Sequence, residues 1–85
     1  MKNVVIYTTE ICPYCIRAKR LLDKKGVPYR EIRVDGNLQL REELIQKSGG
    51  RRTVPQIFVE NIHVGDCDEL HALERAGKLD PLLQD

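Results

Sequence analysis

The chain has 85 residues, with 14 basic and 13 acidic side chains and a formal net charge of +1. This length predicts one small domain covering residues 1–85, and the near-neutral charge argues against nucleic acid as the main partner. No apolar run approaches the roughly 20 residues of a membrane span, and the start of the chain shows no signal peptide. We therefore expect a cytoplasmic protein that does not bind a membrane. Three cysteines are too few for a disulfide-stapled secreted scaffold.

The first third of the chain predicts a strand followed by a helix. Residues 3–8 contain the apolar run Val-Val-Ile-Tyr, typical of a strand covered on both faces. Residues 13–25 show helical periodicity, and Gly26 is placed to end the helix. The apolar stripe expected on this helix comprises Tyr14, Cys15, Ala18, Leu21 and Leu22.

The middle of the chain predicts a second strand and a second helix. Residues 29–34 alternate in polarity, which is typical of a strand near a sheet edge. The turn Asp35-Gly36-Asn37 can cap a helix over 38–48, and Gly49-Gly50 can end it.

The last third predicts a β-hairpin and helical turns. Residues 54–59 and 62–64 form the hairpin, which Gly65 ends. Asp66 and Glu69 have the spacing of a capping box for a third helix. A final turn is expected after Asp80 as its N-cap, with a proline in the first position. The order β-α-β-α-β-β-α predicts an α/β protein of thioredoxin-like fold, with a four-stranded mixed sheet flanked by helices.

The segment Cys12-Pro13-Tyr14-Cys15 lies where the first strand passes into the first helix. Two cysteines three residues apart in a helical turn share a face and are close enough for a disulfide. A helix N-terminus favours a thiolate over a thiol. We expect Cys12 at the exposed entrance as the attacking thiol and Cys15 one turn further in as the resolving thiol.

Two other interpretations of the cysteine pair are weaker. A structural zinc site needs four ligands, but Cys67, His63 and His71 form no second pair at zinc spacing, so no metal is expected. Two ordinary buried cysteines are less expected at a strand–helix junction than a redox-active pair.

Three segments resemble the glutaredoxin family, and the resemblance covers essentially the whole chain. Tyr-Thr-Thr-Glu-Ile-Cys-Pro-Tyr-Cys (7–15) resembles the active site of the bacterial dithiol type, Thr-Val-Pro-Gln-Ile-Phe (53–58) resembles its TVP motif, and Gly-Asp-Cys-Asp-Glu (65–69) resembles its glutathione-binding turn. The resemblance implies a single glutaredoxin domain, with the first strand between the second and third. It also implies an enzyme, a glutathione-dependent disulfide oxidoreductase that reduces protein disulfides and glutathione-mixed disulfides through Cys12 and Cys15.

The resemblance further implies a binding site for glutathione as co-substrate. A cis Pro55 would let the backbone of Val54 pair with the cysteinyl part of glutathione. The N–H groups of Cys67 and Asp68 would hold its γ-glutamyl carboxylate, and the Asp68 side chain would pair its ammonium. The implied binding residues are Tyr14, Thr53, Val54, Pro55, Gly65, Cys67 and Asp68.

Two residues depart from the pattern of many relatives. Thr9 replaces a lysine that contacts the glycine carboxylate of glutathione, a charge that Arg41, Arg51 or Arg52 could supply instead. Asp66 replaces a second glycine, and an extra acid there could weaken carboxylate docking. Cys67 is interpreted as a small semi-buried residue rather than a catalytic one.

A rival interpretation is a binding module, a dimer that holds a [2Fe–2S] cluster through Cys12 and glutathione. Pro13 and Cys15 argue against it, since relatives of that kind mainly lack one or the other. We therefore expect a monomer whose partners are glutathione and disulfide-containing or glutathionylated proteins.

Overall fold

The computed structural model describes residues 1–85. Its elements follow the order β1 (Val4–Thr8), α1 (Pro13–Lys24), β2 (Arg30–Arg33), α2 (Leu38–Lys47), β3 (Gln56–Val59), β4 (Ile62–Gly65), α3 (Cys67–Arg75) and α4 (Leu79–Leu83). The four strands form one sheet in the order β2-β1-β3-β4, with β1 and β2 parallel and the other neighbours antiparallel. The mixed sheet, the central place of β1 and the edge position of β2 are confirmed.

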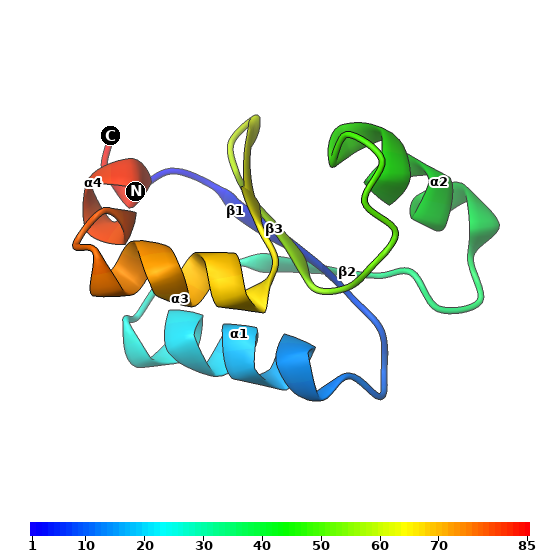
Figure 1. The fold of residues 1–85 in the computed structure, drawn as a ribbon, viewed down its shortest axis with the longest axis horizontal. Helices are drawn as coiled ribbons and strands as arrows, with labels where there is room; N and C mark the ends of the chain where they lie inside the picture. The colour runs from blue at the N-terminus through cyan, green and yellow to red at the C-terminus, as the bar shows by residue number, and fades with distance from the viewer.

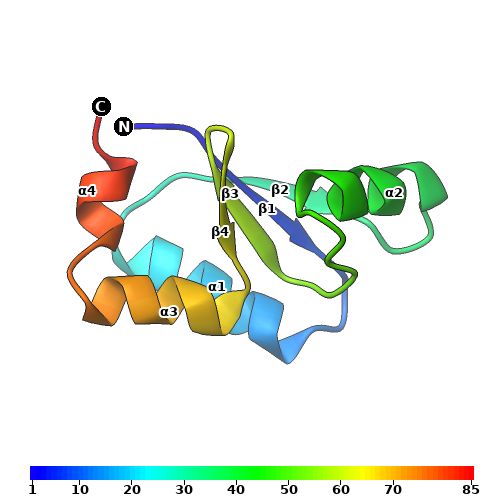
Figure 2. The same ribbon diagram turned by 45° about the horizontal axis from the view of Figure 1, so that its top comes forward.

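The helices divide between the two faces of the sheet. Helices α1 and α3 lie side by side on one face, α2 lies on the other, and α4 packs near the start of β1 (Figures 1 and 2). None of the helices combines the length and the apolar character needed to cross a membrane.

Alternate side chains of β1 serve two separate cores, as the period of a strand requires. Val4 and Ile6 belong to the larger core beneath α1 and α3, together with Ala18 and Leu22. Tyr7 belongs to a smaller core on the other face, shared with Val34, Leu44 and Phe58. Strand β1 is therefore covered on both faces, as its continuous apolar run predicts.

Most of the expected helix ends are found. The side chain of Asn37 accepts a hydrogen bond from the backbone N–H of Leu40 and so caps α2. Asp66 and Glu69 form the capping box of α3 in both directions. Gly26 follows α1 with a φ of +69°, a conformation that favours glycine.

Three details of the sequence prediction are wrong. Strand β3 begins at Gln56 rather than residue 54, because Pro55 has no N–H for the ladder. Helix α4 begins after Lys78, and Asp80 does not cap it; its carboxylate instead pairs with Lys25 at 2.7 Å. Tyr14 is 54% exposed and lies outside the core, because it stands in the first turn of α1 beside a surface groove.

Candidate active site

The two cysteines occupy the start of α1, immediately after the loop that leaves β1. Cys12 is the N-cap residue and Pro13 takes the first helical position, where its missing N–H costs nothing. Their Cα atoms are 5.1 Å apart and the sulfurs form a disulfide, so the structure shows the oxidised state of the pair. The spacing therefore supports reversible oxidation without movement of the backbone.

The cysteines differ in access, although less than expected. Cys12 is 8% exposed and Cys15 is 1% exposed. The first cysteine is thus the more accessible one, but in the disulfide form it is largely covered rather than open at the entrance. The backbone N–H of Cys15 donates to the sulfur of Cys12 over 3.1 Å, which directs the dipole of α1 at that sulfur.

Exposed basic side chains lie on α1. Arg17 is exposed and its guanidinium lies 5.8 Å from the centre of the Tyr14 ring. Arg20 is exposed as well, whereas Lys19 is paired with Glu31 at 2.9 Å. Arg17, the exposed cation beside Tyr14 near the helix start, is therefore available to favour a thiolate at Cys12.

A groove beside Cys12 is built from three segments that are distant in sequence. The sulfur of Cys12 lies 3.8 Å from the carbonyl oxygen of Val54, and the Val54–Pro55 peptide bond is cis. The groove has a volume of about 340 Å³, within the range of small-ligand sites. Its lining comprises Tyr14, Thr53, Val54, Pro55, Asp66, Cys67 and Asp68.

Gly65 lies outside this lining, although it was expected among the binding residues. It is buried at the end of β4 with a φ of +118°, and a Cβ there would collide with the side chain of Glu69. Gly65 therefore shapes the turn that leads into α3 and permits the close approach of Glu69.

The start of α3 forms one wall of the groove. The capping box uses the N–H groups of Asp66 and Glu69, whereas those of Cys67 and Asp68 have no part in it. A helix N-terminus with free N–H groups attracts a carboxylate. The wall can therefore hold an anionic group of a ligand, beside the exposed side chain of Asp68.

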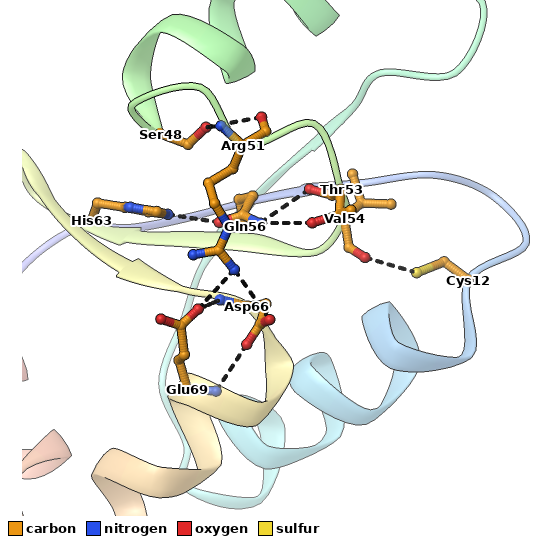
Figure 3. A network of polar contacts seen from close by, with 9 residues as sticks. All are labelled: Cys12, Ser48, Arg51, Thr53, Val54, Gln56, His63, Asp66 and Glu69. Carbon is orange, nitrogen blue, oxygen red and sulfur yellow. Dashed lines mark hydrogen bonds and ion pairs between the residues drawn. The ribbon is translucent and has the colours of Figure 1, made fainter.

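An ion cluster that the sequence analysis did not find joins this wall to the loop that carries Pro55. One guanidinium nitrogen of Arg51 lies 3.2 Å from Asp66 and 2.9 Å from Glu69 (Figure 3). The backbone N–H of Asp66 and the Arg51 guanidinium hold the pKa of Glu69 below its usual range. Asp66 and Glu69 lie 15 and 18 residues after Arg51, so no local sequence pattern predicts these contacts.

A second set of hydrogen bonds fixes the same loop from the other side. The fully buried side chain of Gln56 donates to the carbonyl and the hydroxyl of Thr53, over 3.1 and 3.3 Å. Its oxygen lies 2.6 Å from Nε2 of His63 (Figure 3). The His63 ring also stacks on Phe58. His63 thus acts in packing rather than beside the thiols.

The third cysteine lines the groove but has little chemical access. Cys67 is 1% exposed, and burial raises the pKa of its thiol. Nδ1 of His71 lies 2.8 Å from the backbone carbonyl of Cys67 and 3.5 Å from its sulfur. Cys67 is more deeply buried than the semi-buried position expected, and this burial favours a packing role.

A larger hollow of about 560 Å³ lies on the other face of the sheet, around Tyr7 and Glu43, and it contains no cysteine. No group of three or more His, Cys, Asp or Glu side chains is arranged to hold a metal ion.

Comparison with known proteins agrees with this geometry. The family profile described as Glutaredoxin matches residues 4–64. The chain is 64% identical over 83 residues to a protein named Glutaredoxin from Pseudomonas aeruginosa, covering 98% of each. The solution structure of a glutaredoxin from Brucella melitensis is 53% identical with a TM-score of 0.85, covering 98% of this chain and 89% of that one. A buckwheat glutaredoxin–glutathione complex is 36% identical with a TM-score of 0.85, covering 94% of this chain and 74% of that one.

Proposed function

The chain belongs to the glutaredoxin family and is a glutathione-dependent thiol–disulfide oxidoreductase that acts through Cys12 and Cys15, and we propose that the groove between Val54 and the start of α3 is where it holds glutathione. The observation that carries this proposal is the convergence of Tyr14, the Val54–Pro55 segment and the Asp68 wall beside the Cys12 sulfur. In the complex from buckwheat, a protein of the same fold is bound to glutathione.

The groove offers separate partners for the cysteinyl and γ-glutamyl parts of the tripeptide. The backbone of Val54, beside the Cys12 sulfur, is positioned to pair with the cysteinyl backbone of glutathione in the manner of an added strand. The N–H groups of Cys67 and Asp68 receive the γ-glutamyl carboxylate, and the Asp68 side chain pairs with the ammonium. The exposed ring of Tyr14 lies beside the mixed disulfide, and Thr53 and Pro55 also line the groove.

Reduction of a glutathione-mixed disulfide then takes two exchange steps. The Cys12 thiolate attacks the glutathionyl sulfur, a Cys12–glutathione disulfide forms, and the substrate leaves as a thiolate that takes up a proton. A second glutathione thiolate attacks the bound glutathionyl sulfur, and oxidised glutathione leaves while Cys12 returns to the thiolate. The N–H of Cys15 and the dipole of α1 stabilise the Cys12 thiolate as attacker and as leaving group.

Reduction of a protein disulfide uses both cysteines. Cys12 attacks one sulfur of the substrate and forms a mixed disulfide with it. Cys15 then attacks the Cys12 sulfur, and the substrate leaves with two thiols while the Cys12–Cys15 disulfide of the present structure forms. Two molecules of glutathione restore the dithiol and leave as oxidised glutathione.

We further propose that the protein substrates are disulfide-containing or glutathionylated proteins and that the enzyme works as a monomer in the cytoplasm. The proposed groove is formed by one chain alone, so no second copy is needed to complete it. A pool of reduced glutathione, which the cycle consumes, is a property of a reducing compartment. Light scattering of the reduced protein with glutathione tests whether the enzyme is a monomer, and a measured mass of two chains would contradict this proposal.

The groove assignment is tested with a trapped intermediate. Cys15→Ser treated with oxidised glutathione should hold a stable Cys12–glutathione disulfide. NMR amide shifts between this species and the reduced variant should be largest at Val54, Cys67 and Asp68. Shifts that leave the start of α3 unchanged, and appear instead around Tyr7 and Glu43, would overturn the assignment.

A further inference from the structure

Three acidic side chains gather where the proposed groove has to accept a carboxylate. Asp66, Asp68 and Glu69 all belong to the cap and first turn of α3. Unpaired, they would oppose the attraction that the helix N-terminus exerts on an anionic ligand. Arg51 is the one basic side chain that forms an ion pair with any of them.

Hydrogen bonds to Ser48 hold the backbone of Arg51 in place. The hydroxyl of Ser48, at the end of α2, donates to the carbonyl of Arg51 and accepts from its N–H, both over 3.0 Å. Ser48 is only 6% exposed. The Arg51 side chain therefore extends from a fixed backbone position, just before Thr53, to the cap of α3 (Figure 3).

The ion pairs of Arg51 leave the capping hydrogen bonds of both acids intact. Oδ2 of Asp66 contacts the guanidinium, while Oδ1 accepts the N–H of Glu69. Oε1 of Glu69 accepts both the guanidinium and the N–H of Asp66. Charge neutralisation and helix capping thus coexist, and the N–H groups of Cys67 and Asp68, two residues that line the groove, take no part in the capping box.

We propose that Arg51 is a positioning residue for glutathione: by neutralising Asp66 and Glu69, it keeps the start of α3 able to receive the γ-glutamyl carboxylate. The proposal rests on the glutathione groove described above and adds a specificity determinant to it. Arg51 does not touch the reacting sulfurs. Its effect is on the binding of the γ-glutamyl group and leaves the exchange chemistry of Cys12 unchanged.

The test compares two small mixed disulfides that share one thiol. One carries glutathione and the other carries cysteinylglycine, which lacks the γ-glutamyl group. The measured quantity is the ratio of their kcat/KM values, which cancels changes in Cys12 reactivity. Arg51→Gln should lower this ratio by about two- to fivefold, through the KM of the glutathionyl substrate, and less at high salt. Arg51→Lys, which keeps the charge, should retain most of the ratio.

Removing the charges of Asp66 and Glu69 tests whether Arg51 acts by neutralising them or by holding its loop against α3. Asp66→Asn and Glu69→Gln keep the capping hydrogen bonds because Asn and Gln serve the same cap positions. The triple variant Arg51→Gln/Asp66→Asn/Glu69→Gln should therefore return the ratio to the wild-type value. An unchanged ratio in Arg51→Gln, or a triple variant as low as Arg51→Gln, would overturn the role of Arg51 and leave the groove standing. A wild-type enzyme with no preference for the glutathionyl substrate would overturn the groove as well.

Discussion

The sulfur of Cys12 lies 3.1 Å from the backbone nitrogen of Cys15, so the helix that Cys12 caps donates a hydrogen bond to its own N-cap sulfur. This contact makes the two cysteines unequal. After reduction, the N–H and the helix dipole favour a thiolate at Cys12, whereas Cys15 lies buried behind it.

This inequality predicts the order of thiol reactivity. In variants that retain one cysteine each, Cys12 should react with a neutral alkylating agent at acidic pH, where Cys15 and Cys67 are nearly inert. Burial raises the pKa of Cys67, so this thiol should react only at high pH and slowly. Alkylation rates measured from pH 4 to 10 check the order, and a faster reaction of Cys15 or Cys67 at acidic pH would reverse the assignment.

Asp68→Ala should weaken the use of glutathione without disturbing the thiol. The variant loses the proposed pair with the glutathione ammonium, worth about 0.2–1 kcal/mol for a partly exposed site, so the KM for glutathione should rise up to about fivefold. The rate of neutral alkylation at Cys12 in the same variant serves as the control and should barely change. An unchanged KM would mean that Asp68 supports only its helix.

Glu31→Gln should destabilise the protein in a pH-dependent way. The hydroxyl of Thr8 donates to Glu31 over 2.6 Å and Lys19 pairs with it at 2.9 Å; mainly through the Thr8 bond, the pKa of Glu31 is held below its ordinary value of 4.5. A depressed pKa in the folded state gives stability that is present above pH 4.5 and is lost as the pH falls through the folded-state pKa.

Urea unfolding measures this effect. Glu31→Gln should cost about 0.5–1 kcal/mol at pH 7, and the difference from wild type should narrow between pH 5 and pH 3. Glu42→Gln is the matched control, because Glu42 is an exposed acid on α2. A Glu31→Gln difference of equal size at pH 7 and pH 3 would contradict the ionic account.

Leu44→Ala should detach α2 from the sheet. Leu44 is the one fully buried side chain of this helix and packs in the smaller core with Tyr7, Val34 and Phe58. The truncation should cost about 2–5 kcal/mol, and amide exchange in α2 should accelerate more than in α1. Leu38→Ala, on the same helix but 86% exposed, should change the free energy of unfolding by less than about 0.5 kcal/mol. Equal effects of the two variants would show that Leu44 does not anchor α2.

The features that the sequence predicted correctly are mostly local. The Cys12–Cys15 spacing, the capping box of Asp66 and Glu69, and Gly26 after α1 each depend on residues within one helical turn. The alternating run at residues 29–34 predicts an edge strand and the continuous apolar run at residues 3–8 predicts a central one. Both predictions are local too, because the burial of a strand is visible in the period of its own side chains.

The details that escaped prediction depend on distant partners. Asp80 has the local pattern of a helix cap, but Lys25, which is 55 residues earlier in the chain, pairs with its carboxylate instead. The sequence suggests Arg51 only as a candidate contact for the glycine carboxylate of glutathione, whereas the fold brings it to Asp66 and Glu69. Such ion pairs join segments that only the tertiary fold brings together, so no short window of the sequence contains both partners.

The central claim is that Cys12 carries the glutathione-dependent exchange and Cys15 serves only to resolve protein disulfides. The most direct measurement is an assay with glutathione, glutathione reductase, NADPH and a glutathionylated small thiol, applied to wild type, Cys12→Ser and Cys15→Ser. Wild type and Cys15→Ser should turn over this substrate, and Cys12→Ser should not. Turnover by Cys12→Ser at the wild-type rate, or a Cys15→Ser variant as inactive as Cys12→Ser, would contradict the account.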